Sequence, residues 1–190
     1  DDVRDKDNIQ HVHYQFNGGI KEYVSYINET KERVFEEIPY VTGASSVNPG
    51  GLIYKPITII VEAAFQPTKA GILNRNSFCN NIRTNGGGTH EEGFRLAIGR
   101  ELNAYFRSKG WLKETDDNFR SEDCLEGLTV VLSVKHPDPQ YEGQVKDKLG
   151  NDEVRRVVSS IVGDYLKEWL LEHPNEGKAW YERVISAFKG

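Results

Sequence analysis

One lysine lies in a segment whose residue types would let it reach a phosphate group. Lys146 is surrounded by prolines at positions 137 and 139 and by glycines at positions 143 and 150. These residue types favour a loop that projects from regular structure and can rearrange. A flexible lysine in such a loop can bring a point charge to a terminal phosphate and stabilise the charge on a transferring phosphoryl group. From the residues alone, Lys146 and its neighbour Lys148 can equally be solvated loop lysines.

Three arginines share a segment whose apolar residues recur with the period of a helix. Over residues 91–108, one face carries apolar side chains and the other carries Arg100 and Arg107, with Arg95 at the border between them. This pattern is typical of an amphipathic helix packed on a core. On this pattern alone, the arginines are the solvated side of the helix.

Several other groupings resemble reactive sites without completing one. His90 is followed by Glu91 and Glu92, but no second histidine occurs four residues later, as the HExxH zinc motif requires. His11 and His13 share one face of a predicted strand, yet no cysteine or third histidine is near them in sequence. We therefore predict no metal site. An independent enzyme that uses His90 with one of the two glutamates is kept as an alternative.

The glycines at positions 86–88 precede the predicted helix, where an anion could bind. Neither GxxxxGK[ST] nor GxGxxG occurs, so we interpret the glycines as hinge and close-packing positions. We expect Thr89 and the two glutamates after His90 to serve the start of the helix, where carboxylates suit the helix dipole. Cys79 and Cys124 are interpreted as small packing residues.

The strands and helices that must position these residues are predicted from the periodicity of apolar residues and from breaks at Gly, Pro and Asn. The expected strands cover residues 11–16, 57–65, 77–82 and 128–134, and the expected helices cover residues 20–29, 91–108, 152–172 and 177–189. In the third helix, Asn151 or Asp152 can act as the cap, and the inward side chains are Val154, Val157, Val158, Ile161, Tyr165 and Trp169. In the last helix, one stripe carries Trp180, Val184 and Phe188.

The order β-α-β-β-α-β-α-α predicts an α+β fold, a two-layer sandwich of a mostly antiparallel four-stranded sheet and helices. We expect one domain over residues 1–190, with residues 1–10 frayed, residues 43–51 a loop insertion and residues 109–124 a polar loop. The chain has no methionine, even at position 1, so we interpret it as a segment of a longer protein.

The composition is that of a globular domain. Hydrophobic residues make up 37% and charged residues 28% of the 190 residues, and no stretch approaches the length of a membrane span. Two cysteines can pair only once, which favours a reducing compartment over a disulfide scaffold. The net charge of −5 argues against a dedicated nucleic-acid-binding domain but is compatible with one basic face on an acidic body.

Two blocks of this sequence carry a family resemblance. Residues 80–95, NNIRTNGGGTHEEGFR, resemble the NNI…GGTH..GF signature of the transducer domain in type IIA topoisomerase ATPase subunits, which are gyrase B and its topoisomerase IV counterpart. Residues 133–150, SVKHPDPQYEGQVKDKLG, resemble the switch loop of the same domain. The blocks occur in the family's order and at about its spacing. The resemblance is weakest over residues 1–10 and 43–76.

The resemblance implies specific roles for five residues. It implies that Lys146, the lysine of a Q-x-K motif, and Gln144 contact the γ-phosphate of ATP held by a neighbouring domain. Val145 stands where threonine is common, at a position that does not contact the phosphate. The resemblance also implies that the helix carrying Arg95, Arg100 and Arg107 borders a cavity through which a DNA duplex passes.

The resemblance further implies partners and an activity outside this sequence. ATP would be bound mainly by an N-terminal GHKL ATPase domain with Mg²⁺, and residues 152–190 would lead to a metal-binding cleavage domain. The full protein would dimerise, assemble with a gyrase A-type subunit in the cytoplasm at the nucleoid, or in an organelle of bacterial descent, and pass DNA strands. We expect this segment alone to be inactive towards ATP. A stand-alone nucleic-acid or ribosome-associated binding module remains the alternative.

Overall fold

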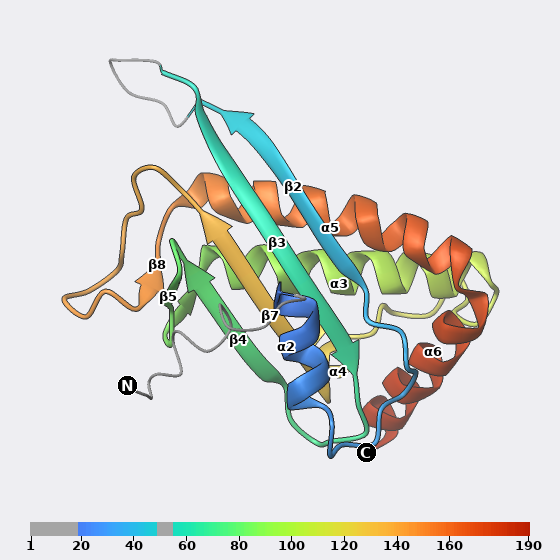
Figure 1. The fold of residues 1–190 in the computed structure, drawn as a ribbon. Coiled ribbons are helices and arrows are strands. Elements are labelled where there is room, and N and C mark those ends of the chain that lie inside the picture. Colours follow the sequence, from blue (N-terminus) through green and yellow to red (C-terminus); the bar gives the residue numbers. More distant parts are fainter. Residues whose placement is uncertain (1–18, 49–54) are drawn as a thin grey trace.

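The computed structural model describes residues 19–48 and 55–190. A five-stranded sheet has three helices, α3 (Thr89–Ser108), α5 (Asp152–Glu172) and α6 (Pro174–Lys189), on one face, and the short helix α2 (Gly19–Ile27) on the other (Figure 1). The α+β fold class is therefore confirmed. The expected strand over residues 11–16 lies outside the described residues.

The sheet has the order β2-β3-β7-β4-β5. The strands are β2 (Tyr40–Val47), β3 (Ile57–Pro67), β4 (Asn74–Cys79), β5 (Ile82–Arg83) and β7 (Leu128–Lys135). Neighbours pair antiparallel except β4 and β7, which are parallel. The sheet is thus mixed and has five strands in the described part of the chain, where four mostly antiparallel strands were expected.

Alternating side chains divide the apolar residues between the two faces of the sheet. On β3, Ala63 and Phe65 pack towards α3 and α5, whereas Ala64 packs towards α2. On β7, Leu132 belongs to the larger core and Val131 to the smaller one under α2. Buried apolar side chains of both strands, including Ile59 and Val61 on β3 and Val130 and Val134 on β7, also belong to the larger core, so β3 and β7 form the centre of the molecule.

Strand β2 corrects the sequence interpretation. Residues 43–47 were expected to lie in a loop insertion, but they pair with β3 in the register Gly43↔Val61 to Val47↔Ile57. Gly43 faces α5, since a Cβ atom added to it would lie 3.1 Å from the side chain of Ile161. The pairing with β3 and the contact with α5 are tertiary interactions, and they outweigh the poor strand propensity of Gly-Ala-Ser-Ser.

The expected helices are present with small changes. Helix α3 begins two residues earlier than expected, and Ser121–Leu125 form a short helix α4 within the segment expected to be a polar loop. The inward side chains expected on α5 are buried except Ile161 and Tyr165, which are partly buried. On α6, Phe188 is 61% exposed, so the buried stripe contains Trp180, Val184 and Ala187 instead.

Pro174 begins α6 directly after α5 ends, because its missing N–H is tolerated in the first helical turn. Asn151 occupies the N-cap position of α5 but makes no side-chain capping hydrogen bond, contrary to expectation. Within the described residues, no helix is long and apolar enough to cross a membrane.

Candidate functional site

The segment between β7 and α5, called here the 136–150 loop, is closed at its base by backbone contacts. Glu142 N donates to Lys148 O at 2.9 Å, and Gly150 N donates to Gln140 O at 2.7 Å. The tip between these contacts carries Gln144 and Lys146, both exposed. Neither side chain has a hydrogen-bond or ion-pair partner among the described residues. The structure therefore places the two predicted phosphate contacts together on a projecting tip.

The C-terminal end of the 136–150 loop packs against the triple glycine at positions 86–88, which precedes α3. Strand β8 (Lys148–Leu149) pairs in parallel with strand β6 (Gly87–Gly88), and Gly86 N donates to Asp147 O at 2.9 Å. Gly88 has φ 131°, and a Cβ atom there would lie 2.2 Å from Leu149 O. The close packing expected of these glycines is confirmed. It brings the two sequence blocks into direct contact.

The N-terminal end of the loop, at His136, is held by a cluster of four side chains. They are Asn80, His136, Asn151 and Glu153, and they are called here the loop-base cluster. Asn80 and His136 exchange two hydrogen bonds of 2.9 Å, in which His136 N donates to Asn80 Oδ1 and Asn80 Nδ2 donates to His136 O. His136 Nε2 lies 2.8 Å from Glu153 Oε2, and Asn151 Nδ2 donates to the same oxygen at 3.0 Å. Burial acts to raise the pKa of the Glu153 carboxyl, but hydrogen bonds from His136, from its own backbone N–H and from Asn151 together hold that pKa below its usual range.

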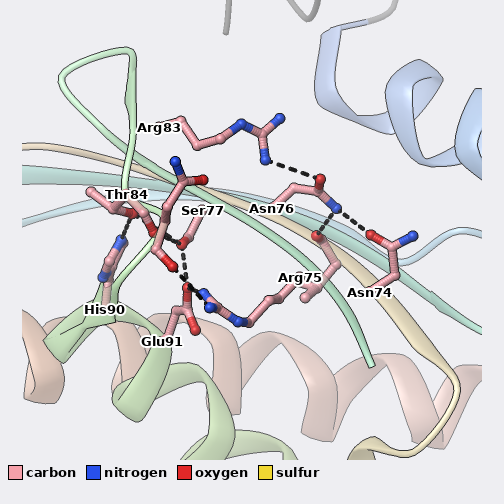
Figure 2. A network of polar contacts seen from close by, with 10 residues as sticks. Asn74, Arg75, Asn76, Ser77, Arg83, Thr84, His90 and Glu91 are labelled. Carbon is pink, nitrogen blue, oxygen red and sulfur yellow. Dashed lines mark hydrogen bonds and ion pairs between the residues drawn. The ribbon is translucent and has the colours of Figure 1, made fainter. Parts of the chain in front are cut away.

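A second polar network lies beside the triple glycine and joins β4 to the first turn of α3 (Figure 2). Thr84 Oγ1 donates to Ser77 Oγ at 3.0 Å, and Ser77 Oγ donates to the Glu91 carboxylate. Arg75 Nη1 pairs with Glu91 Oε2 at 2.7 Å. His90 Nε2 lies 2.8 Å from Thr84 Oγ1. Because Thr84 donates its only hydroxyl proton to Ser77, His90 Nε2 must be the donor in this hydrogen bond. His90 is therefore the neutral Nε2–H tautomer.

Burial lowers the pKa of His90 to about 4, with a smaller contribution from the positive charge of Arg75. Among the described residues, His90 Nδ1 and Thr89 Oγ1 are buried without a hydrogen-bond partner. Thr89 therefore makes none of the capping bonds expected of it. The two glutamates after His90 accept hydrogen bonds from arginines outside α3: Glu91 accepts from Arg75, and Glu92 accepts from Arg155.

The three arginines of α3 lie in different environments. Arg95 is exposed and has no partner among the described residues. Arg100 donates to Ser159 Oγ at 2.8 Å and Ser159 O at 3.0 Å, and so ties α3 to α5. Arg107 donates to carbonyl groups of the 109–120 segment, at Lys113 and Asp116. The structure brings the three onto one helix but leaves only Arg95 of the three unbonded.

The other sequence candidates are structural. Cys79 and Cys124 are buried free thiols, and burial raises the pKa of Cys124 to about 12. The packing interpretation of both is confirmed. In residues 19–48 and 55–190, no group of three or more His, Cys, Asp or Glu side chains is arranged to hold a metal ion. His11 and His13 lie outside these ranges.

Sequence reasoning missed the loop-base cluster. Asn151 was interpreted as a helix cap, and His136 and Asn80 were identified only as members of the two sequence blocks. Two adjacent asparagines, Asn80 and Asn81, both have positive φ, which asparagine tolerates better than most residues. The Asn-Asn pair after a predicted strand was the available signal for a tight turn at this position.

The chain is similar to known proteins in both sequence and fold. A family model described as DNA gyrase B matches residues 19–189. The gyrase B protein of Spiroplasma citri is 42% identical over 190 residues, which cover 99% of this chain and 28% of that protein. The gyrase B protein of Streptococcus pneumoniae strain TIGR4 is 43% identical over 180 residues, which cover 95% of this chain and 26% of that protein.

Among solved structures, the 43K ATPase domain of Thermus thermophilus gyrase B in complex with an aminocoumarin superposes with a TM-score of 0.76. It is 32% identical, and the match covers 90% of this chain and 43% of that one. The chain thus spans between a quarter and a third of the length of these curated relatives. Because the family model matches nearly the whole described region and these relatives are more than 40% identical, the chain belongs to the DNA gyrase B family.

Proposed function

We propose that this chain is the transducer domain of a gyrase B-type subunit of an ATP-dependent type IIA topoisomerase. In this role, Lys146 and Gln144 contact the γ-phosphate of ATP held with Mg²⁺ by an N-terminal ATPase domain of the same protein. The observation that carries the proposal is the unbonded Lys146 at the tip of a loop whose base lies against the triple glycine.

The arrangement suits a residue that acts on a ligand outside its own domain. An ammonium group without an internal partner keeps its full charge for an incoming phosphate, and the charge becomes more effective when water is excluded. Once hydrolysis removes the γ-phosphate, the loop loses that contact and can return to its resting position. The loop continues directly into α5, so its displacement can change the direction of that helix.

We also propose that Arg95 contacts the phosphate backbone of a DNA duplex. An exposed arginine without an internal partner can bind phosphate regardless of base sequence. Arg100 and Arg107 would add positive charge to the same helix while keeping their internal hydrogen bonds. The other partners follow from the family: the cleavage domain of the same protein, a gyrase A-type subunit and a second copy of the full-length protein, all in the cytoplasm.

The experiment that tests the phosphate role is Lys146→Ala in the full-length protein carrying this sequence. ATP turnover should fall by about 100-fold, because a group that stabilises transferring charge is lost, whereas nucleotide affinity should change little. Turnover is measured by phosphate release and affinity by equilibrium binding of a non-hydrolysable analogue. Lys148→Ala is the matched control, since Lys148 lies in the same loop but pairs with Glu142. Undiminished turnover in Lys146→Ala would remove the lysine from this role.

The DNA role is tested by Arg95→Gln in the same full-length protein. Loss of one phosphate contact should weaken DNA binding equally for all sequences and reduce the slope of log K against log[salt] by about 1. Binding titrations at several salt concentrations measure this slope. Lys109→Gln at the far end of α3 is the control. An unchanged slope would mean that Arg95 is solvated in the complex.

A further inference from the structure

Asn151 uses its side chain in an unexpected way for a residue at a helix N-cap. An asparagine at this position normally accepts a hydrogen bond from an N–H group of the first helical turn. Here Asn151 Oδ1 accepts from Gln140 N at 2.6 Å, and Asn151 Nδ2 donates to Asp138 O at 3.3 Å. Both partners lie in the 136–150 loop. The side chain is therefore engaged by the loop, although the helix that it precedes is left without its cap.

His136 connects the same two elements. Its Nδ1 accepts from Asp138 N at 2.9 Å, so this nitrogen is unprotonated and the neutral ring carries its proton on Nε2. Nε2–H then donates to Glu153 Oε2 at 2.8 Å, in the first turn of α5. Both residues are almost fully buried from solvent: His136 is 4% exposed and Asn151 is 7% exposed. Two buried side chains thus join loop residues 138–140 to the start of α5.

The sheet supplies the third attachment of this cluster. The pair of hydrogen bonds between Asn80 and His136 fixes the start of the loop to the turn between β4 and β5. The loop therefore meets a fixed sheet on one side and a helix on the other.

We propose that His136 and Asn151 are positioning residues that transmit displacement of the 136–150 loop to α5; this inference rests on the proposed phosphate contact of Lys146. When Lys146 moves towards a γ-phosphate, residues 138–140 move with it, and the hydrogen bonds of Asn151 and His136 pass that movement to the first turn of α5. Without these bonds, the loop can still bring Lys146 to the phosphate. What is lost is the link between nucleotide state and the direction of α5.

The test uses Asn151→Ser in the full-length protein assembled with its A-type partner. Serine caps a helix about as well as asparagine but has no amide to reach Asp138 and no second polar atom for Gln140. ATP turnover and KM should stay within about twofold, whereas supercoils introduced into plasmid DNA per ATP hydrolysed should fall about fivefold or more, as expected for the loss of a coupling interaction. Ser160→Ala, on an exposed position of the same helix, is the control.

A second pair of variants tests the same link through Glu153. Glu153→Gln keeps an oxygen that can accept His136 Nε2–H and should retain most of the supercoiling per ATP. Glu153→Ala removes the acceptor and should lower that ratio as Asn151→Ser does. A purely structural role would instead lower ATP turnover, supercoiling and melting temperature together, and the ratio would stay constant. That outcome, or an unchanged ratio in both Asn151→Ser and Glu153→Ala, would overturn the inference.

Lys146→Ala measured in parallel separates the two proposals. Retained ATP turnover in Lys146→Ala would overturn the proposed function itself. Lost turnover in Lys146→Ala, together with a normal ratio of supercoils to ATP hydrolysed in both Asn151→Ser and Glu153→Ala, would overturn the positioning role alone.

Discussion

Four cationic residues belong to the proposed ATP and DNA sites, and two of them, Lys146 and Arg95, form no hydrogen bond or ion pair within the described residues. Both are exposed and have no partner among the described residues, whereas Arg100 and Arg107 are held by neighbouring carbonyl and hydroxyl groups. Sequence patterns identified all four residues, but they could not separate bonded from unbonded cations. That distinction depends on groups distant in sequence, such as Ser159 for Arg100.

His90 makes the stability of the domain depend on pH in a predictable direction. Its folded pKa of about 4 lies below the ordinary value of 6.5. As the pH falls, His90 is therefore protonated in the unfolded chain before it is protonated in the folded one. Its contribution to the free energy of unfolding is complete above pH 6.5 and is lost as the pH falls towards 4. Between pH 7.5 and pH 5 the wild type should lose about 2 kcal/mol more stability than His90→Gln.

Urea unfolding of both proteins at these two pH values measures this difference. His173→Gln is the control, because that histidine is partly exposed and lies at the end of α5. Equal pH dependence in the wild type and His90→Gln would show that the pKa of His90 is the same in the folded and unfolded states, so that burial does not lower it.

At the scale of elements, helices α3 and α5 approach closely at two glycines that differ in what faces them. A Cβ atom at Gly93 would lie 2.3 Å from the backbone oxygen of Arg155, and one at Gly163 would lie 2.1 Å from Arg100 Nη2. A backbone carbonyl cannot move without separating the helices, whereas the end of an arginine side chain can rotate away.

Gly93→Ala should therefore destabilise the domain by about 2–3 kcal/mol through overpacking. Gly163→Ala should cost about 1 kcal/mol or less, because the gain in helix propensity offsets the displaced Arg100 contacts. Free energies of urea unfolding at pH 7.5 distinguish the two cases. A larger loss for Gly163→Ala than for Gly93→Ala would mean that Arg100, not the helix backbones, sets the separation of α3 and α5.

The elements predicted best from sequence are those whose own residues determine them. The β-branched run of β3 and the apolar period of α5 were sufficient for both elements. Strand β2 was missed because its strand conformation depends on pairing with β3, not on its own residues. Helix α4 was missed because it is short and acidic, and Phe188 was expected to be buried because helical period alone does not show where the packing partner ends.

At the scale of the whole molecule, the candidate site is an exposed loop tip, not an enclosed pocket. Gln144 and Lys146 lie in water, and the sequence contains neither GxxxxGK[ST] nor GxGxxG to hold the other phosphates. Two side chains in water bind a nucleotide weakly and do not exclude solvent from it.

We therefore expect this chain alone to release phosphate from ATP no faster than its own Lys146→Ala variant. The full-length protein, assayed in parallel, should show clear dependence on Lys146. A steady, Lys146-dependent turnover by the purified chain would contradict the transducer assignment.

The contact between the two sequence blocks was not predictable from spacing alone. Each block has its own local pattern, but the pairing of β6 with β8 brings together residues far apart in sequence. The resemblance placed both blocks in one domain, and only the fold shows that Gly88 lies against Leu149.

The central position of β7 has a consequence for biosynthesis. This strand fills the gap between β3 and β4, yet it is the last of the five sheet strands to leave the ribosome. Until Leu128–Lys135 has emerged, the hairpins on either side each present an unpaired edge to which other nascent chains can bind. Closing a sheet between segments so distant in sequence is also slow. The growing polypeptide therefore has an aggregation-prone interval that ends when β7 inserts, and ribosome-bound chaperones would have most effect on its yield during that interval.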